Sequence, residues 1–419
     1  MLGNRDSIEE AEGHQEKPYS QSSRRTAQLA TVAVILIIVL SPLGFNTDKL
    51  PISLSWNEKT LTRDSYSELS MAVDAEGAVH VCYGSPLGLA YATNAGGKWS
   101  EIKLGQSAYF CSIAVDSEGF IHIAGIDDNR DLSYISNRLG AWNITQVDWN
   151  IWGYPLSIAV DSKDCAHISY CKSTLKYATN SNGSWTTCTP IDRDVLAFEG
   201  LSSDIAVDSN DKVHIACEEG VVVYITNANG NWSWEQVSGL DITYSPSIAV
   251  DNDGVPHVGY IGRITYPGVW GLQHATRIEN EWSTLSVEAL ESSMYPSCSL
   301  AVDRDGRTHM SYIHRETGEL KYARIGEDGF STNTLSHQAY GGLTSCAIGT
   351  DADNHVHMVF VDRFHDLRYL TDEPPTMFLS VLLEGALVKA AFCVPVLAIY
   401  FIGMRIRRRR DSPSGFWAE

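Results

Sequence analysis

The sequence predicts an all-β fold: a seven-bladed β-propeller closed by an N-terminal strand and flanked by two transmembrane helices. Three observations support this. One motif recurs seven times, each copy contains four short strands, and two apolar segments flank the repeats. The chain has 419 residues, of which 44% are hydrophobic and 20% charged, so it can bury a large core.

The repeated motif is represented by SIAVDSEGFIHIAG, residues 112–125. Every copy has an aspartate: Asp74, Asp116, Asp161, Asp208, Asp251, Asp303 and Asp351. Six residues later every copy has a histidine: His80, His122, His167, His214, His257, His309 and His357. Successive aspartates are 42 to 52 residues apart, a period typical of propeller blades.

The residues around each aspartate indicate a hairpin turn. Three positions after it stands a residue type that tolerates a left-handed backbone: Gly77, Gly119, Asp164, Asp211, Gly254, Gly306 or Asn354. An aspartate at the start of a turn can accept backbone N–H bonds, so we interpret the seven aspartates as turn formers. The sevenfold repetition favours structural hydrogen bonds for the histidines as well. We predict no metal site and no cofactor, because a ring holds equivalent residues of different blades apart.

The rest of each repeat supplies a third and a fourth strand. A segment such as LKYATN is followed by a Gly or Asn turn and an aromatic residue: Trp99, Trp142, Trp185, Trp232, Trp282 or Phe330. The seventh repeat ends at Asp372 without a fourth strand, whereas residues 54–62 resemble one and contain Trp56. We therefore expect the N-terminal strand to complete blade 7, which removes the open sheet edges.

Two patterns carry a family resemblance over residues 51–372. The pattern I-A-V-D-x-x-G-x-x-H-I resembles NHL-type seven-bladed repeats, and L-K-Y-A-T-N-x-x-G-x-W is similar to the sialidase-like (BNR-like) repeat families. Both resemblances imply a propeller. A sialidase Asp-box, S-x-D-x-G-x-x-W, has its aspartate and aromatic residue in one turn, whereas here they stand on different hairpins.

Five parts follow along the chain: a tail at 1–26, an apolar segment at 27–45, the propeller at 51–372, a second apolar segment at 377–404, and a basic tail at 405–419. Each apolar segment is near the ~20 residues that cross a bilayer. Basic residues precede the first and follow the second, so we expect a cell-membrane protein with both termini cytoplasmic and the propeller outside. The first segment could instead be a cleaved signal sequence.

The predicted external part is acidic and rich in cysteine. Residues 27–376 carry 21 basic and 43 acidic side chains, a net charge of −22, which would repel nucleic acid. Eight of the nine cysteines lie here, where disulfides are permitted, but their pairing stays open. Three sequons predict glycosylation at Asn143, Asn182 and Asn231.

Ligand contacts are expected at the mouth of the central channel, on the loops that enter the first strand and join the second to the third. Aromatic residues there suit a sugar or peptide: Tyr66, Tyr109, Tyr154, Tyr244, Tyr295, Tyr266 and Trp270. The alternative is that the tyrosines pack between blades. The last two residues belong to the loop at 263–271, the longest of its kind and the best single candidate for contact with a partner.

Two functions from different classes remain. We favour a membrane-anchored recognition or scaffold module that binds a glycan, peptide or protein and has no catalytic residues. The alternative is a sialidase-like exo-glycoside hydrolase, in which Arg263, Arg315 and Arg363 bind a carboxylate and Tyr266 is the nucleophile. That alternative also needs a carboxylic acid with a raised pKa.

Overall fold

The computed structural model describes residues 56–63, 65–105, 110–151, 156–191, 202–218, 220–239, 243–265, 269–290, 297–314, 316–340 and 346–374. The predicted membrane segments at 27–45 and 377–404 and both tails lie outside this part of the chain. Within it, no helix is long and apolar enough to span a bilayer.

The described residues form seven antiparallel four-stranded sheets, which confirms the predicted seven-bladed propeller. The strands of blades 1 to 3 are β2 (Tyr66–Val73), β3 (Val79–Ser85), β4 (Gly88–Thr93) and β5 (Ser100–Lys103); β6 (Phe110–Val115), β7 (Ile121–Ile126), β8 (Leu132–Ser136) and β9 (Asn143–Asp148); and β10 (Ser157–Val160), β11 (Ala166–Cys171), β12 (Leu175–Thr179) and β13 (Thr186–Cys188). Those of blades 4 and 5 are β14 (Ser203–Val207), β15 (Val213–Glu218), β16 (Val222–Thr226) and β17 (Ser233–Gln236); and β18 (Thr243–Val250), β19 (Pro256–Thr265), β20 (Val269–Ile278) and β21 (Glu281–Leu290). Those of blades 6 and 7 are β22 (Cys298–Val302), β23 (Thr308–His314), β24 (Glu319–Gly326) and β25 (Gly329–Ser336); and β26 (Cys346–Thr350), β27 (Val356–Val361), β28 (Leu367–Thr371) and β1 (Asn57–Thr62).

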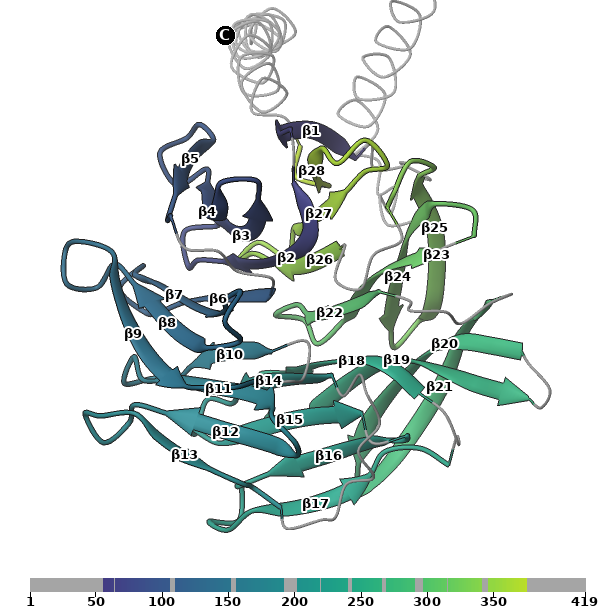
Figure 1. Cartoon of the computed structure of the whole chain (residues 1–419). Coiled ribbons are helices and arrows are strands. Elements are labelled where there is room, and N and C mark those ends of the chain that lie inside the picture. The colour runs from purple at the N-terminus through teal and green to yellow at the C-terminus, as the bar shows by residue number, and fades with distance from the viewer. Residues whose placement is uncertain are drawn as a thin grey trace, which may run out of the picture. The chain divides into compact units, whose positions relative to one another are not determined.

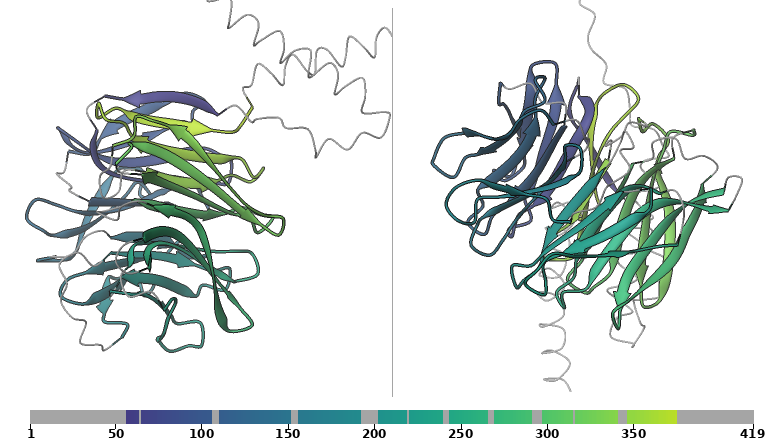
Figure 2. Two further views of the ribbon diagram at one scale, coloured as in Figure 1. Left: turned by 90° about the vertical axis from the view of Figure 1, so that its right-hand side faces the viewer. Right: turned by 60° about the horizontal axis from the view of Figure 1, so that its bottom comes forward.

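The N-terminal strand closes the ring as predicted. Strand β1 pairs with β28, with Asn57 opposite Thr371, and forms the outer edge of blade 7 (Figure 1). The innermost strands follow one another around the centre, and the last of them, β26, packs beside the first, β2. Both views in Figure 2 show the purple N-terminal strand beside the yellow C-terminal strands. The Arg368 guanidinium reinforces this pairing by binding Glu58 at 2.6 Å.

The motif aspartates shape the turn between the first two strands. In blade 2, Oδ1 of Asp116 accepts the backbone N–H groups of Glu118 at 3.0 Å and Phe120 at 2.8 Å. The fourth turn residue has a positive φ in all seven blades, from 59° at Asp211 to 83° at Gly77. Glycine and short polar residues adopt this conformation at low cost, which explains the residue types found there.

The motif histidines connect this turn to the third strand. In blade 2, Nε2 of His122 lies 3.0 Å from Oδ2 of Asp116, and its Nδ1 lies 2.7 Å from the Tyr134 hydroxyl. Burial lowers the pKa of His122, so we assign a neutral imidazole whose Nε2–H donates to the aspartate and whose Nδ1 accepts the tyrosine O–H bond. We call this set the Asp–His–Tyr triad. Five blades have both hydrogen bonds. In blade 4, His214 bonds Tyr224, but its Nε2 lies 3.4 Å from Asp208 without a hydrogen bond, and in blade 5 His274 stands where the others have tyrosine.

The triad tyrosines also join neighbouring blades. The ring of Tyr134 packs against Trp185 of the next blade with centroids 5.0 Å apart. The same contact, at 5.0 to 5.3 Å, occurs at six of the seven seams formed by the described residues. The exception is the seam between blades 5 and 6, where His274 and Phe330 replace the pair and Phe330 is 49% exposed.

Because an aromatic pair contributes about 1 kcal/mol beyond its buried area, we predict that the seam between blades 5 and 6 opens most often. The Leu300 amide, which donates to Ser247 across this seam at 3.0 Å, should exchange with deuterium about fivefold faster than the Ile158 amide, which donates to Ser112 across another seam at 3.1 Å. Exchange followed by mass spectrometry checks this. Equal or slower exchange at Leu300 would contradict the prediction.

Six of the described cysteines are free thiols: Cys82, Cys165, Cys171, Cys188, Cys298 and Cys346. Cys82, Cys171 and Cys346 are buried small residues in the strands, and burial raises the pKa of the Cys346 thiol. They therefore fill space in the core rather than cross-link the blades.

Candidate functional site

The ring has two different ends. At one end are the turns that follow the innermost strands; we call it the turn end. At the other are the loops that enter the innermost strands and the loops that join second to third strands; we call it the loop face. The turn end is built from the repeat, whereas the loop face differs from blade to blade. Differences between blades are where specific recognition can arise.

Neighbouring turns at the turn end are tied to one another. Oδ1 of Asp211 accepts the backbone N–H of Ser162 from the preceding blade at 2.9 Å, and Asn354 accepts that of Arg304 at 3.0 Å. Asp164 accepts both the hydroxyl and the amide of Ser117. These polar groups therefore serve the ring itself.

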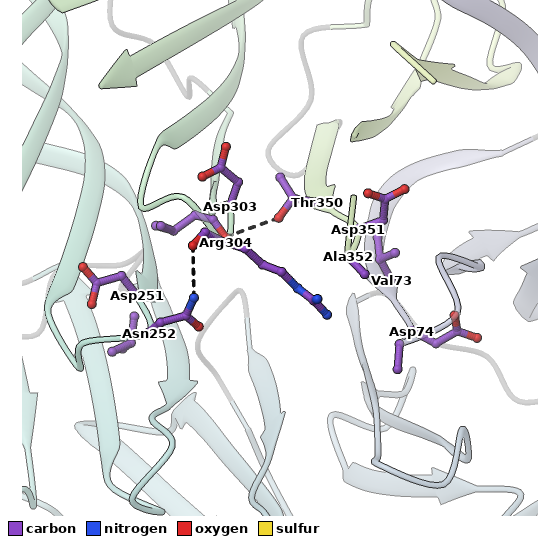
Figure 3. Close-up of a pocket in the computed structure, with 12 residues that line it drawn as sticks. Val73, Asp74, Asp251, Asn252, Asp303, Arg304, Thr350, Asp351 and Ala352 are labelled. Carbon is purple, nitrogen blue, oxygen red and sulfur yellow. Dashed lines mark hydrogen bonds between the residues drawn. The ribbon is translucent and has the colours of Figure 1, made fainter. Parts of the chain in front are cut away.

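A cavity of about 270 Å³ lies at the turn end, between the turns of blades 1, 5, 6 and 7 (Figure 3). Four motif aspartates line it: Asp74, Asp251, Asp303 and Asp351. Each of these carboxylates already accepts hydrogen bonds from its own turn and from a histidine. The Arg304 side chain crosses the cavity in Figure 3, and its carbonyl accepts a bond from Asn252 at 3.2 Å. Because the four carboxylates already accept these hydrogen bonds, they have little remaining capacity to bind a ligand in the cavity.

The structure describes only part of the site predicted from the sequence. Arg263, Tyr244 and Trp270 are described in blade 5, and Arg363 in blade 7. Tyr66 lies in strand β2. Tyr109, Tyr154, Tyr266, Tyr295 and Arg315 lie outside the described residues. Arg263 and Arg363 stand on the loop face two blades apart, with blade 6 between them.

Two of the predicted aromatic residues are brought together in blade 5. The rings of Tyr244 and Trp270 are stacked, with centroids 5.5 Å apart and planes at 26°. Tyr244 begins the innermost strand, and Trp270 follows the loop between the second and third strands. Arg263 is the cross-strand neighbour of Trp270, so a cation stands beside the stacked pair. Both rings are half-buried, so they pack within the blade and also keep a surface toward solvent.

One acid on the loop face is perturbed. Glu218 ends β15, and burial raises the pKa of its carboxyl to about 7, although hydrogen bonds from Ser202 and the Ser245 amide oppose the shift. The Ser202 hydroxyl donates to Oε2 at 3.0 Å. Ser245 follows Tyr244 and has φ of +50°, an unusual conformation for serine. A carboxyl group that titrates near neutral pH can exchange a proton with a ligand.

Blade 7 presents a second group of side chains on the loop between β27 and β28. The Arg363 guanidinium lies over the Phe364 ring, 4.9 Å from its centroid, and Phe364 is 61% exposed. The rings of Tyr340 and His365 are 5.1 Å apart. Of these four residues, only Arg363 was among the site candidates predicted from the sequence.

Other large apolar side chains also stand exposed on this face, on loops of several blades. They are Leu87, Trp149 and Val269, with exposed fractions of 72%, 56% and 44%. An apolar residue between two turn formers, as in Ser85-Pro86-Leu87-Gly88, is the sequence signal that could have revealed the first of them. Such residues lie where a partner could cover them.

The three sequon asparagines, Asn143, Asn182 and Asn231, are all exposed. They lie in or beside the turn between the third and fourth strands of blades 2, 3 and 4, away from the loop face.

No group of three or more His, Cys, Asp or Glu side chains that could hold a metal occurs in the described part of the chain.

No protein-family model matches the chain, and no curated protein sequence matches it. Among solved structures, the chain is similar to virginiamycin B lyase from Staphylococcus aureus, with 11% identity and a TM-score of 0.51 over 76% of this chain and 99% of that one. It is also similar to an ulvan lyase, described as a polysaccharide lyase, with 13% identity and a TM-score of 0.52 over 78% of this chain and 99% of that one. Likeness at this level of identity shows a shared propeller fold.

Proposed function

We propose that this chain is a recognition module whose ring binds a saccharide or peptide on its loop face. We further propose that the segments at 27–45 and 377–404 anchor the ring in a membrane, with both termini in the cytoplasm. The repeated patterns also lead us to propose kinship with NHL-type and sialidase-like repeat proteins. The observation that carries the recognition proposal is the set of large apolar side chains exposed on non-repeated loops of one face.

The two ends of the ring differ in what they can offer a ligand. The motif carboxylates at the turn end accept hydrogen bonds from their own turn and a histidine, so a ligand that bound them would have to break bonds that hold the blades. The loop face instead presents aromatic rings beside arginines, which suits ligands with an apolar surface and a few polar groups. The ulvan lyase with the same fold is named for a saccharide substrate, so we would screen saccharides first.

The raised pKa of Glu218 is the one observation that favours a second candidate function, that of a glycoside-cleaving enzyme. A glycoside-cleaving enzyme, including the sialidase-like hydrolase, needs an acid whose pKa lies near the working pH, and Glu218 has a pKa of about 7 on the loop face. The proton donor would be its carboxyl, held by Ser202 and by Ser245 of the neighbouring blade.

We predict that the full chain in lipid nanodiscs binds a subset of a glycan and peptide array and does not cleave a fluorogenic sialoside. Trp270→Ala should weaken binding at least tenfold, because the variant removes half of the stacked pair. Glu218→Gln serves as the catalytic control. Turnover that is lost in Glu218→Gln would refute the recognition proposal in favour of the enzyme.

A further inference from the structure

The loop between β27 and β28 shares its scaffold with the loop between β7 and β8 in blade 2. Asp362 Oδ1 accepts the N–H groups of Phe364 at 2.8 Å and Asp366 at 3.0 Å. In blade 2, Asp127 Oδ1 accepts those of Asn129 and Asp131, both at 2.9 Å. The fourth turn residue has a positive φ in each: 63° at His365 and 65° at Arg130.

The tips of these two loops differ although the turn is the same. Blade 2 has Asp128-Asn129-Arg130 between the two aspartates, and blade 7 has Arg363-Phe364-His365. The turn geometry therefore does not explain why a large ring and a cation stand exposed in blade 7. A function of the tip is the remaining reason for side chains that are costly to expose.

The blade 7 loop is also held from both sides. The Arg363 amide donates to the Gln338 carbonyl at 2.7 Å, and the Tyr340 amide donates to the Val361 carbonyl at 2.8 Å. On the other side, the Ser65 amide donates to the His365 carbonyl at 2.8 Å. A loop fixed at three points loses little conformational entropy when a ligand binds, so its side chains are preorganised.

The Arg363 guanidinium is available for an anion. Among the described residues, no carboxylate lies within ion-pair distance of it; the nearby buried Asp362 lies 3.8 Å from Arg368 instead. Arg363 is exposed and rests on the Phe364 ring, and Tyr340, 37% exposed, stands beside His365. A guanidinium binds a carboxylate through two parallel hydrogen bonds, and the adjacent rings offer apolar surface to the body of the ligand.

We infer that this loop selects a saccharide that carries a carboxylate, namely a uronic acid, with Arg363 pairing the carboxylate and Phe364 and Tyr340 contacting the sugar ring. The inference rests on the proposed recognition function and names the ligand class. The acidic surface, with a net charge of −22 over residues 27–376, repels long polyanions, so we expect a single or chain-terminal uronate.

The test compares methyl β-D-glucuronide with methyl β-D-glucoside, titrated by NMR against the full chain in nanodiscs of zwitterionic lipid. We expect at least a tenfold preference for the glucuronide, and its loss in Arg363→Ala. Arg304→Ala, which removes an exposed arginine at the turn end, should keep the preference. A triple variant, Arg363→Asp with Phe364→Asn and His365→Arg, gives blade 7 the tip of blade 2 and should abolish glucuronide binding without a change in Tm.

Several outcomes would overturn the inference. Equal binding of the two glycosides, or an undiminished preference in Arg363→Ala, would show that Arg363 does not read the carboxylate, while saccharide recognition would stand. Binding of an acidic peptide through Arg363, with no binding of the glucuronide, would replace the ligand class. Binding of neither glycoside nor any array ligand would refute the recognition function as well.

Discussion

Lowering the pH below about 6.5 is expected to destabilise the ring. Burial lowers the pKa of six motif histidines below the usual 6.5, although each aspartate partner opposes the shift: His80, His122, His167, His214, His257 and His309. Because their folded-state pKa is depressed, the unfolded chain binds more protons below pH 6.5, and stability falls as the pH falls. Each such histidine contributes to this loss with the same sign, so the six contributions add.

We therefore expect the ring to lose stability on acidification, with more than one proton taken up per molecule on unfolding. Circular dichroism against pH, combined with denaturant melts at fixed pH, measures both quantities. His122→Gln should reduce the uptake, because it removes one of the buried imidazoles whose pKa is lowered in the folded ring. An uptake of one proton or fewer would contradict the neutral triads.

Replacing Trp56 by alanine is expected to destabilise the ring by about 3 kcal/mol. Trp56 immediately precedes β1 and packs on Tyr322 of blade 6 with centroids 5.1 Å apart, against a core that includes Phe360 and Leu370. The variant removes the aromatic contact at the seam that the N-terminal strand closes. Chemical denaturation of the two proteins gives the difference directly.

Trp149 provides a matched control, because it is 56% exposed on the loop face. Trp149→Ala should change the free energy of unfolding by no more than about 0.5 kcal/mol. If Trp56→Ala were equally harmless, the N-terminal strand would not be what closes and stabilises the ring.

The fold was predictable because its information is local and repeated. The spacing from Asp116 to His122 recurs seven times, and turn residues such as Gly119 and Asp164 lie within the same short segment. Even the closure by β1 follows from a missing tryptophan strand at one end and Trp56 at the other. Each of these inferences needs only neighbouring residues or a count of repeats.

The triads were only partly predictable. The turn supplies Asp116 and His122, but the third member, Tyr134, becomes visible only when the register between β7 and β8 is known. The same holds for Asn137, whose side chain accepts the Ile121 amide at 2.8 Å. Blade 5 departs from the pattern with Pro256, which has no amide to donate, and Arg277 accordingly stands in the place of that asparagine.

The candidate site was the least predictable part, because it depends on contacts between blades. The pKa of Glu218 rises through burial against the neighbouring blade, and its hydrogen-bond partner Ser245 comes from strand β18, 27 residues later. Trp149 and Phe364 belong to no repeat position, so the pattern that identified the blades could not indicate their exposure. Cysteine pairing was undecidable for the same reason, and Cys82, Cys171 and Cys346 are free thiols in the structure.

The central claim is that the repeated residues hold the ring while the non-repeated loop face binds the ligand. The most direct test is to map the footprint of the best array ligand by hydrogen–deuterium exchange on the full chain. We predict protection at the loops around Glu218, Trp270 and Arg363, and none at the turns around Asp251 and Arg304. Protection confined to those turns, with the loop face unaffected, would contradict the account.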